Sequence, residues 1–187
     1  MKLFFSALIA VFCSVFLLSA IPALAEQTPD ELAKESREAC IASASTKATP
    51  QMVMDKVEKA AALLQKEGKA AFPKFRGKDS EFIFAGTYMF IHDLTGTILV
   101  NPVVYKMEGH NNTDLKDATG KLFFISMNEV AKTKGAGWVD YMWPKPGEKT
   151  PSLKVSYVKL VKVDGEDIVV GCGVWDVPPE EVAKLVK

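Results

Sequence analysis

The stretch Gly135–Tyr157, GAGWVDYMWPKPGEKTPSLKVSY, decides the fold because it predicts a β-hairpin. Segments rich in aromatic and β-branched residues flank a turn that holds prolines and a glycine. Side chains alternate between the two faces of a strand. On the first strand Trp138, Asp140 and Met142 lie on one face, and Val139, Tyr141 and Trp143 lie on the other. On the returning strand the two sets are Lys154 with Ser156, and Val155 with Tyr157.

Aromatic rings beside one lysine at the corner of a sheet are typical of two different structures. The rings exclude water and the ammonium of Lys154 supplies positive charge, so the sheet could close around something small and negatively charged. Alternatively, the aromatic side chains belong to the core of a half-buried hairpin and Lys154 is solvated. The remainder of the sequence favours the first interpretation.

The composition fits one compact domain with short extensions. The chain has 187 residues, of which 48% are hydrophobic and 25% are charged, unlike a disordered tail. It carries 23 basic and 23 acidic residues, and no basic run is long enough to indicate nucleic-acid binding. We therefore predict that nucleic acid is not a partner.

The N-terminus has the pattern of a secretory signal peptide. Lys2 is followed by an uncharged run that ends in Ala23-Leu24-Ala25. Small residues at these positions predict cleavage after Ala25, which places the mature chain in the periplasm or outside the cell. The alternative is an uncleaved membrane anchor, because the run is long enough to span a bilayer.

Cleavage would remove Cys13 and leave two cysteines, Cys40 and Cys172. An exported protein with two cysteines could form a disulfide between them. Two buried free thiols are equally compatible with the sequence, because two cysteines fix no geometry.

Two helices are predicted before the sheet begins. Thr28 and Thr49 are each followed by proline, the combination typical of a helix N-cap and first turn. The first helix is predicted to run to about Ala44 and the second to about Gln65, with helical character resuming over residues 70–75.

Strands follow from residue 82 onward. We expect a first strand over residues 84–93, a tight turn with Gly96, and a short strand over residues 97–100. A polar connection over residues 105–117 could lie over a site, and a helix should follow through Lys134. Three further strands end at Trp175, before a short C-terminal helix predicted to lie at the surface. This order predicts an α+β domain with an antiparallel sheet.

Four blocks of this sequence resemble a known family. They are YMFIHDLTGTILVNP, GHNNTDLKDATGKLFF, GAGWVDYMWPKPGEKTPSLKVSYVK and DIVVGCGVWD, in that order. Together they resemble the single Cache domain, the PAS-like extracytoplasmic sensor module of bacterial chemoreceptors and histidine kinases. The resemblance covers residues 55–176. It divides the chain into a signal peptide (1–25), an N-terminal helical extension (26–50), the Cache domain (51–177) and a C-terminal short helix (178–187).

The resemblance implies a long N-terminal helical region beside a five- or six-stranded antiparallel sheet, with one crossover helix and one ligand pocket. It also implies binding of small metabolites, often short carboxylates such as pyruvate, lactate, acetate or propionate. In such a pocket Lys154 would neutralise the carboxylate and tyrosine hydroxyls would orient it. The candidate ligand-binding residues are Tyr88, His110, Trp138, Tyr141, Trp143, Lys154 and Tyr157. Alternation separates Lys154 from Tyr157, so one of them would need a bulge or a strand end to reach the ligand.

We expect a binding protein without catalytic activity, cofactor or metal. The sequence contains two histidines, His92 and His110, and has no G-x-S-x-G, H-E-x-x-H or phosphate-loop motif. The polypeptide ends eleven residues after Asp176, so the domain is expected to act through a separate membrane receptor or histidine kinase. It could also form a homodimer. The alternative function is an exported interaction module that docks onto such a membrane protein without a ligand of its own.

Overall fold

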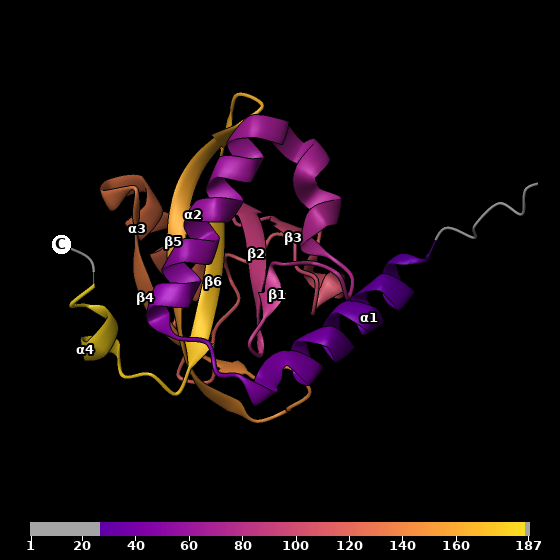
Figure 1. Ribbon diagram of the computed structural model, residues 1–187. Coiled ribbons are helices and arrows are strands. Elements are labelled where there is room, and N and C mark those ends of the chain that lie inside the picture. The colour runs from indigo at the N-terminus through magenta and orange to yellow at the C-terminus, as the bar shows by residue number, and fades with distance from the viewer. Residues whose placement is uncertain (1–26, 186–187) are drawn as a thin grey trace, which may run out of the picture.

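A computed structural model describes residues 27–185 as helices on both faces of one antiparallel sheet (Figure 1). The predicted signal peptide lies outside the described residues. The helices are α1 Pro29–Ala42, α2 Pro50–Glu67, α3 Phe123–Lys134 and α4 Pro179–Val182, with 3₁₀ segments η1 Ser43–Ser45, η2 Gly68–Phe75 and η3 Tyr105–Met107. The strands are β1 Ile83–Phe84, β2 Thr87–Asp93, β3 Ile98–Val100, β4 Ala136–Pro144, β5 Pro151–Val163 and β6 Glu166–Trp175.

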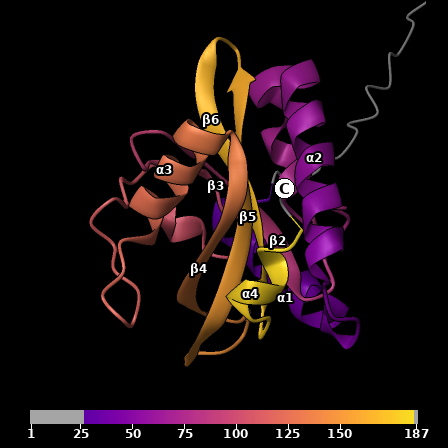
Figure 2. The ribbon, with the colours of Figure 1, turned by 90° about the vertical axis from the view of Figure 1, so that its left-hand side faces the viewer.

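The six strands follow the order β1-β2-β6-β5-β4, and β3 pairs with β2 beside this path. Every pairing between these strands is antiparallel. Helix α3 connects β3 to β4 and is the crossover helix. The α+β fold class predicted from the sequence is therefore confirmed. Figure 2 shows the sheet from its edge, with α2 on one side and α3 on the other.

Both predicted helix starts are confirmed. At α1 the Thr28 hydroxyl accepts from the backbone N–H of Glu31 (3.3 Å), and the Glu31 carboxylate accepts from the Thr28 N–H (2.8 Å), which is a capping box. At α2 the Thr49 hydroxyl accepts from the N–H of Met52 (3.2 Å). These bonds satisfy donors that would otherwise lack partners in the first turn.

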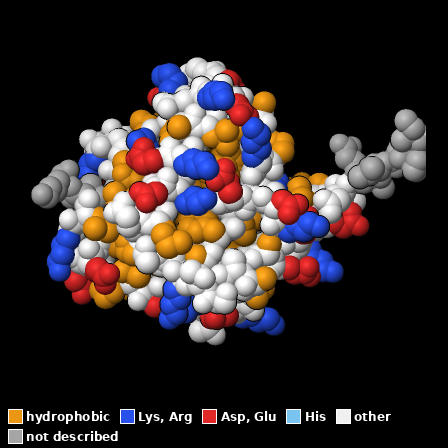
Figure 3. All heavy atoms as spheres, viewed as in Figure 1, with side chains coloured by type: hydrophobic (Ala, Val, Ile, Leu, Met, Phe, Trp, Pro, Cys, Tyr) orange, Lys and Arg blue, Asp and Glu red, His pale blue; other side chains and the backbone are white. Residues whose placement is uncertain are grey.

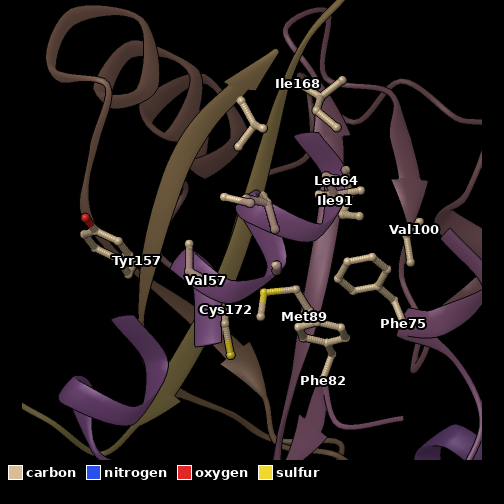
Figure 4. Close-up of a cluster of buried hydrophobic side chains, with 14 of the residues drawn as sticks. Val57, Leu64, Phe75, Phe82, Met89, Ile91, Val100, Tyr157, Ile168 and Cys172 are labelled. Atoms are coloured by element: carbon tan, nitrogen blue, oxygen red, sulfur yellow. The ribbon is translucent and has the colours of Figure 1, made fainter. Parts of the chain in front are cut away.

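Alternation along the strands divides the core into two layers. Odd-numbered residues of β5 and even-numbered residues of β6 face α2, where they pack with side chains from β2 and η2 (Figure 4). The opposite face packs against α3 and contains Phe90, Phe123, Tyr141 and Val158. Lysines and acids are intermixed on the outer side of α2 and around it, where Lys59 pairs with Glu81 and Glu58 pairs with Lys159 of β5 (Figure 3).

The first strand differs from its prediction. A single strand was expected over residues 84–93, but Ala85 and Gly86 form a turn with φ of 48° and 75° that separates β1 from β2. The Gly86 N–H donates to the Ser43 hydroxyl (3.0 Å), which ties this turn to η1. A glycine readily adopts positive φ, so the turn forms where strand propensity alone predicts continuation. The C-terminal helix also differs in part, because its Val182 is buried.

Candidate ligand-binding site

Lys154 lies buried on the α3-facing side of the sheet, near the start of β5, and is 1% exposed. It is on β5, and its neighbours come from β2, β4 and β6. The Nζ atom lies over four aromatic rings, which we call the aromatic cage. The distances from Nζ to the ring centroids are 4.2 Å for Trp175, 4.4 Å for Tyr88, 5.7 Å for Phe90 and 5.9 Å for Tyr141. Such contacts attract a cation through the negative faces of the rings.

Glycine on the neighbouring strand makes room for this lysine. A Cβ atom added at Gly173 of β6 would overlap the Cε atom of Lys154 and the hydroxyl oxygen of Ser156. A Cβ atom at Gly171, two residues earlier on the same face, would overlap the ring of Phe90. The two glycines therefore let long side chains from β5 and β2 lie flat across β6.

Hydrogen bonds fix the polar tips of the surrounding side chains. The Tyr141 and Ser156 hydroxyls lie 3.0 Å apart. The Trp143 indole N–H donates to the Tyr88 hydroxyl (3.2 Å), and the Trp175 indole N–H donates to the Trp143 carbonyl (2.9 Å). Because Tyr88 accepts in its bond, its own hydroxyl hydrogen can be donated to another acceptor.

The electrostatics of the cage favour an anion. Within residues 27–185 no carboxylate lies within 4.0 Å of the Lys154 Nζ atom. Burial lowers the pKa of Lys154 to about 8, so the side chain is still charged at neutral pH. Burial raises the pKa of both Tyr88 and Tyr141, which keeps their hydroxyls as neutral donors. A buried charge without a partner is costly, and a bound carboxylate would provide that partner.

A cavity of about 20 Å³ lies beside the cage. It is lined by Tyr88, Phe90, Ile98, Asn101, Met107, Phe123, Phe124, Met127, Tyr141, Trp143 and Lys154. This volume suffices for about one water molecule, whereas the family resemblance implied a ligand pocket. A short acid needs more space, so binding requires that side chains move. Met107 and Met127 are suited to this, because methionine changes rotamer easily.

The structure brings together four of the predicted binding residues, Tyr88, Tyr141, Trp143 and Lys154. It does not place Trp138 or Tyr157 with them. These two pair across β4 and β5 in an unbroken register, and their ring centroids lie 5.2 Å apart, with the rings tilted by 54°, on the α2-facing side of the sheet. The bulge that could have turned Tyr157 toward Lys154 is absent from this pairing, so both residues leave the candidate site.

The two histidines also lie outside the cavity lining. His110 is exposed in the connection that follows η3, whereas Asn101, directly after β3, and Met107, in η3, line the cavity. His92 is fully buried on the cage-facing side of β2, with its Nδ1 atom 3.1 Å from the Asp93 carbonyl. Burial lowers the pKa of His92 to about 4, so it is neutral and packs between Phe90 and Phe124.

Trp175 and Phe90 belong to the aromatic cage but were not among the binding residues predicted from the sequence. Gly171, Gly173 and Trp175 recur every second residue on one face of β6, a pattern in which small residues leave space that other side chains must fill. This pattern was available in the sequence. Without the strand order, however, it did not indicate which side chains fill the space.

The two cysteines are buried free thiols in the structure. Cys40 packs with Tyr88 and Val103, and the Cys172 sulfur lies 3.5 Å from the Thr87 hydroxyl. Across residues 27–185, histidine, cysteine and acidic side chains form no group of three that could hold a metal ion.

Residues 43–180 match the family described as Single Cache domain 2. This chain belongs to the single Cache domain family. Over 98 residues, or 52% of the chain, it is 35% identical to the methyl-accepting chemotaxis protein McpP of Pseudomonas putida. The chain spans only 18% of the length of that receptor. The Cache resemblance found in the sequence is thus confirmed.

Solved structures of sensor domains are also similar to this Cache domain. A methyl-accepting chemotaxis protein from Vibrio parahaemolyticus has a TM-score of 0.54 at 19% identity, covering 76% of this chain and 95% of that chain. A Cache chemosensory domain described as recognising carboxylic acids is 38% identical, with a TM-score of 0.46, over 49% of this chain and 60% of that chain.

Helix α1 lies before the range that matches the family. None of the helices described between residues 27 and 185 has the length and apolar character needed to cross a membrane.

Proposed function

We propose that this Cache domain is a sensor that binds a small carboxylate through Lys154, without catalysis. The observation that supports this most strongly is a charged lysine, 1% exposed, that is surrounded by aromatic rings and has no acidic partner in the described part of the chain. The Tyr88 hydroxyl can donate to the same carboxylate. The mostly apolar lining suits a short hydrocarbon tail.

The size of such a ligand limits its affinity. Six heavy atoms at a ceiling of about 1.5 kcal/mol each give about 9 kcal/mol, close to micromolar binding. Opening a cavity of about 20 Å³ costs part of this free energy, so we expect dissociation constants from micromolar to millimolar. That range serves a sensor of metabolites.

Titration calorimetry with acetate, propionate, lactate and pyruvate tests the proposal. We expect at least one acid to bind with 1:1 stoichiometry, and propionamide, a neutral analogue of propionate, to bind at least tenfold more weakly. Lys154→Met should abolish binding. Lys159→Met is the matched control, because Lys159 lies on the same strand but pairs with Glu58 on the opposite face. Equal binding of acid and amide would contradict the role of Lys154.

A second function is favoured by the small cavity. If the protein's own side chains fill the site permanently, the domain acts as an interaction module that docks onto a membrane receptor or kinase. In that case no acid in the panel would raise the melting temperature, while a membrane protein would co-purify with the domain after cross-linking in cells.

We further propose that the mature chain is exported and signals through a separate membrane protein. Cache domains are extracytoplasmic sensors, and the receptor relative carries its matching stretch within a much longer chain. The mass of the protein from a periplasmic fraction tests export, since cleavage after Ala25 gives a defined N-terminus. A mature mass that still includes the leader would contradict it.

A further inference from the structure

A surface groove of about 490 Å³ lies directly outside the aromatic cage. It is bounded by α1, by the segment after β3 and by the turn between β4 and β5. Its lining consists of Arg37, Tyr88, Val103, Val104, Trp143, Pro144, Lys145, Pro146, Gly147 and Glu148. Tyr88 and Trp143 line both this groove and the small cavity at Lys154. The side chains of these two residues therefore lie between the groove and the cavity.

One hydrogen bond joins the two side chains of this partition. The Trp143 indole N–H donates to the Tyr88 hydroxyl at 3.2 Å. The backbone behind it is anchored, because the Trp143 carbonyl accepts from the Trp175 indole (2.9 Å). Rotation of the half-buried Trp143 side chain therefore breaks one neutral hydrogen bond and the ring contacts with Phe123 (5.5 Å between centroids) and Tyr141 (6.3 Å), and leaves β4 in place.

The charges along the groove favour an anion at its α1 end. Arg37 is exposed and donates from Nη2 (3.0 Å) and Nε (3.4 Å) to the Val103 carbonyl. No carboxylate of residues 27–185 forms an ion pair with it. At the other end, Lys145 pairs with Asp176 (2.6 Å) and lies near Glu148, so this end offers no free positive charge. A guanidinium without an acidic partner beside aromatic walls suits a carboxylate.

We propose that this groove is the entrance to the Lys154 cavity, with Arg37 as the outer anion contact and the Trp143–Tyr88 pair as the gate. The inference rests on the proposed function, since it concerns how an acid reaches Lys154. It also gives α1 a role: this helix precedes the family's matched range and brings Arg37 to the groove.

The gate is tested by Trp143→Phe, which keeps an aromatic ring and removes the indole N–H. Stopped-flow fluorescence with propionate as the probe measures both rate constants, and Trp175 remains as the reporter. We expect association and dissociation to accelerate together, by about 2- to 10-fold, because one hydrogen bond no longer holds the gate closed. A change in dissociation alone, or in neither rate, would show that Trp143 is only a wall.

The outer contact is tested by Arg37→Gln. Removing one charge beside the path of an anion should slow association about 2- to 3-fold at low salt, and the difference should vanish at high ionic strength. Arg37→Lys should restore the rate, since it keeps the charge. Lys34→Gln is the matched control, because Lys34 is exposed on the same helix, next to Glu38, and does not line the groove. Equal association for wild type and Arg37→Gln would overturn the proposal.

Iodide quenching tests the groove independently of any carboxylate. The fluorescence that comes from Trp143 is the difference between the emission of wild type and that of Trp143→Phe. We expect iodide to quench this component less in Arg37→Gln than in wild type, while neutral acrylamide quenches both equally. If no acid binds but the iodide effect is present, the proposed function fails and the anion-attracting groove remains. If Arg37→Gln does not change iodide quenching, the entrance is wrong even where acids bind.

Discussion

Replacing Lys154 with methionine should make the unliganded protein more stable. Methionine keeps an unbranched chain of similar length and removes a charge that is 1% exposed. Burial lowers the pKa of Lys154 from 10.5 to about 8. This shift corresponds to a cost in folding free energy of about 3 kcal/mol, because the buried ammonium stays charged at pH 7. Attraction between the ammonium and the rings of the aromatic cage offsets about 1–2 kcal/mol of this cost. We therefore expect the free energy of unfolding of Lys154→Met to exceed that of wild type by about 1–2 kcal/mol.

The pH dependence of this gain has a definite sign. Below pH 8 the lysine is protonated in both the folded and the unfolded protein, and the full cost of burying the charge is present. Between pH 8 and 10.5 the folded protein releases the proton first, so the cost falls as the pH rises. The advantage of Lys154→Met should therefore be largest near pH 7 and small near pH 10.5.

Urea denaturation of wild type, Lys154→Met and the control Lys159→Met at pH 7 and pH 10 measures both effects. At pH 7 the expected gain corresponds to a rise in melting temperature of about 2–8 °C for a chain of this size. A methionine variant that is less stable than wild type at pH 7 would refute the reasoning, and so would an advantage that does not narrow at pH 10. Either result would mean that the buried ammonium is already satisfied without a ligand.

Three further changes test separate parts of the structure. Gly173→Ala should displace the lysine from the cage, destabilise the fold by about 1–3 kcal/mol and weaken acid binding, as urea melts and calorimetry would show. Burial opposes ionisation of Asp117, but four hydrogen bonds to its carboxylate outweigh burial and lower its pKa to about 2. Asp117→Asn should therefore lower the free energy of unfolding by about 1–3 kcal/mol at pH 7. This difference from wild type should shrink as the pH falls from 3.8 toward 2. Burial raises the pKa of Cys40 to about 12 and of Cys172 to about 11. Iodoacetamide should therefore label neither thiol in the native protein and both thiols in urea. A native mass two daltons below the mass of the reduced protein would indicate a disulfide instead.

Local rules predicted the elements and the faces of the strands. Thr28 and Thr49 cap their helices as expected, because capping depends on residues within one turn. The hairpin around the turn at residues 145–150 has the predicted sets of side chains, with Tyr141 opposite Lys154 and Trp138 opposite Tyr157. These features need no knowledge of distant parts of the chain.

The composition of the site could not be predicted in the same way, because it depends on strand order. Trp175 reaches Lys154 only because β6 lies between β2 and β5, and local patterns do not encode that order. The misplacement of Trp138 and Tyr157 has another cause: alternation separated Tyr157 from Lys154, but aromatic content alone suggested a shared pocket. His110 was included because its loop could lie over the site, and it is exposed instead.

Proton uptake during binding tests the central claim most directly. A carboxylate bound at Lys154 should raise the pKa of the lysine from about 8 back toward its usual value. Calorimetry in two buffers with different ionisation enthalpies should then show uptake of about 0.5 proton per propionate at pH 8 and almost none at pH 6.5. Binding without proton uptake at pH 8, or uptake that persists in Lys154→Met, would contradict a buried lysine as the partner of the ligand.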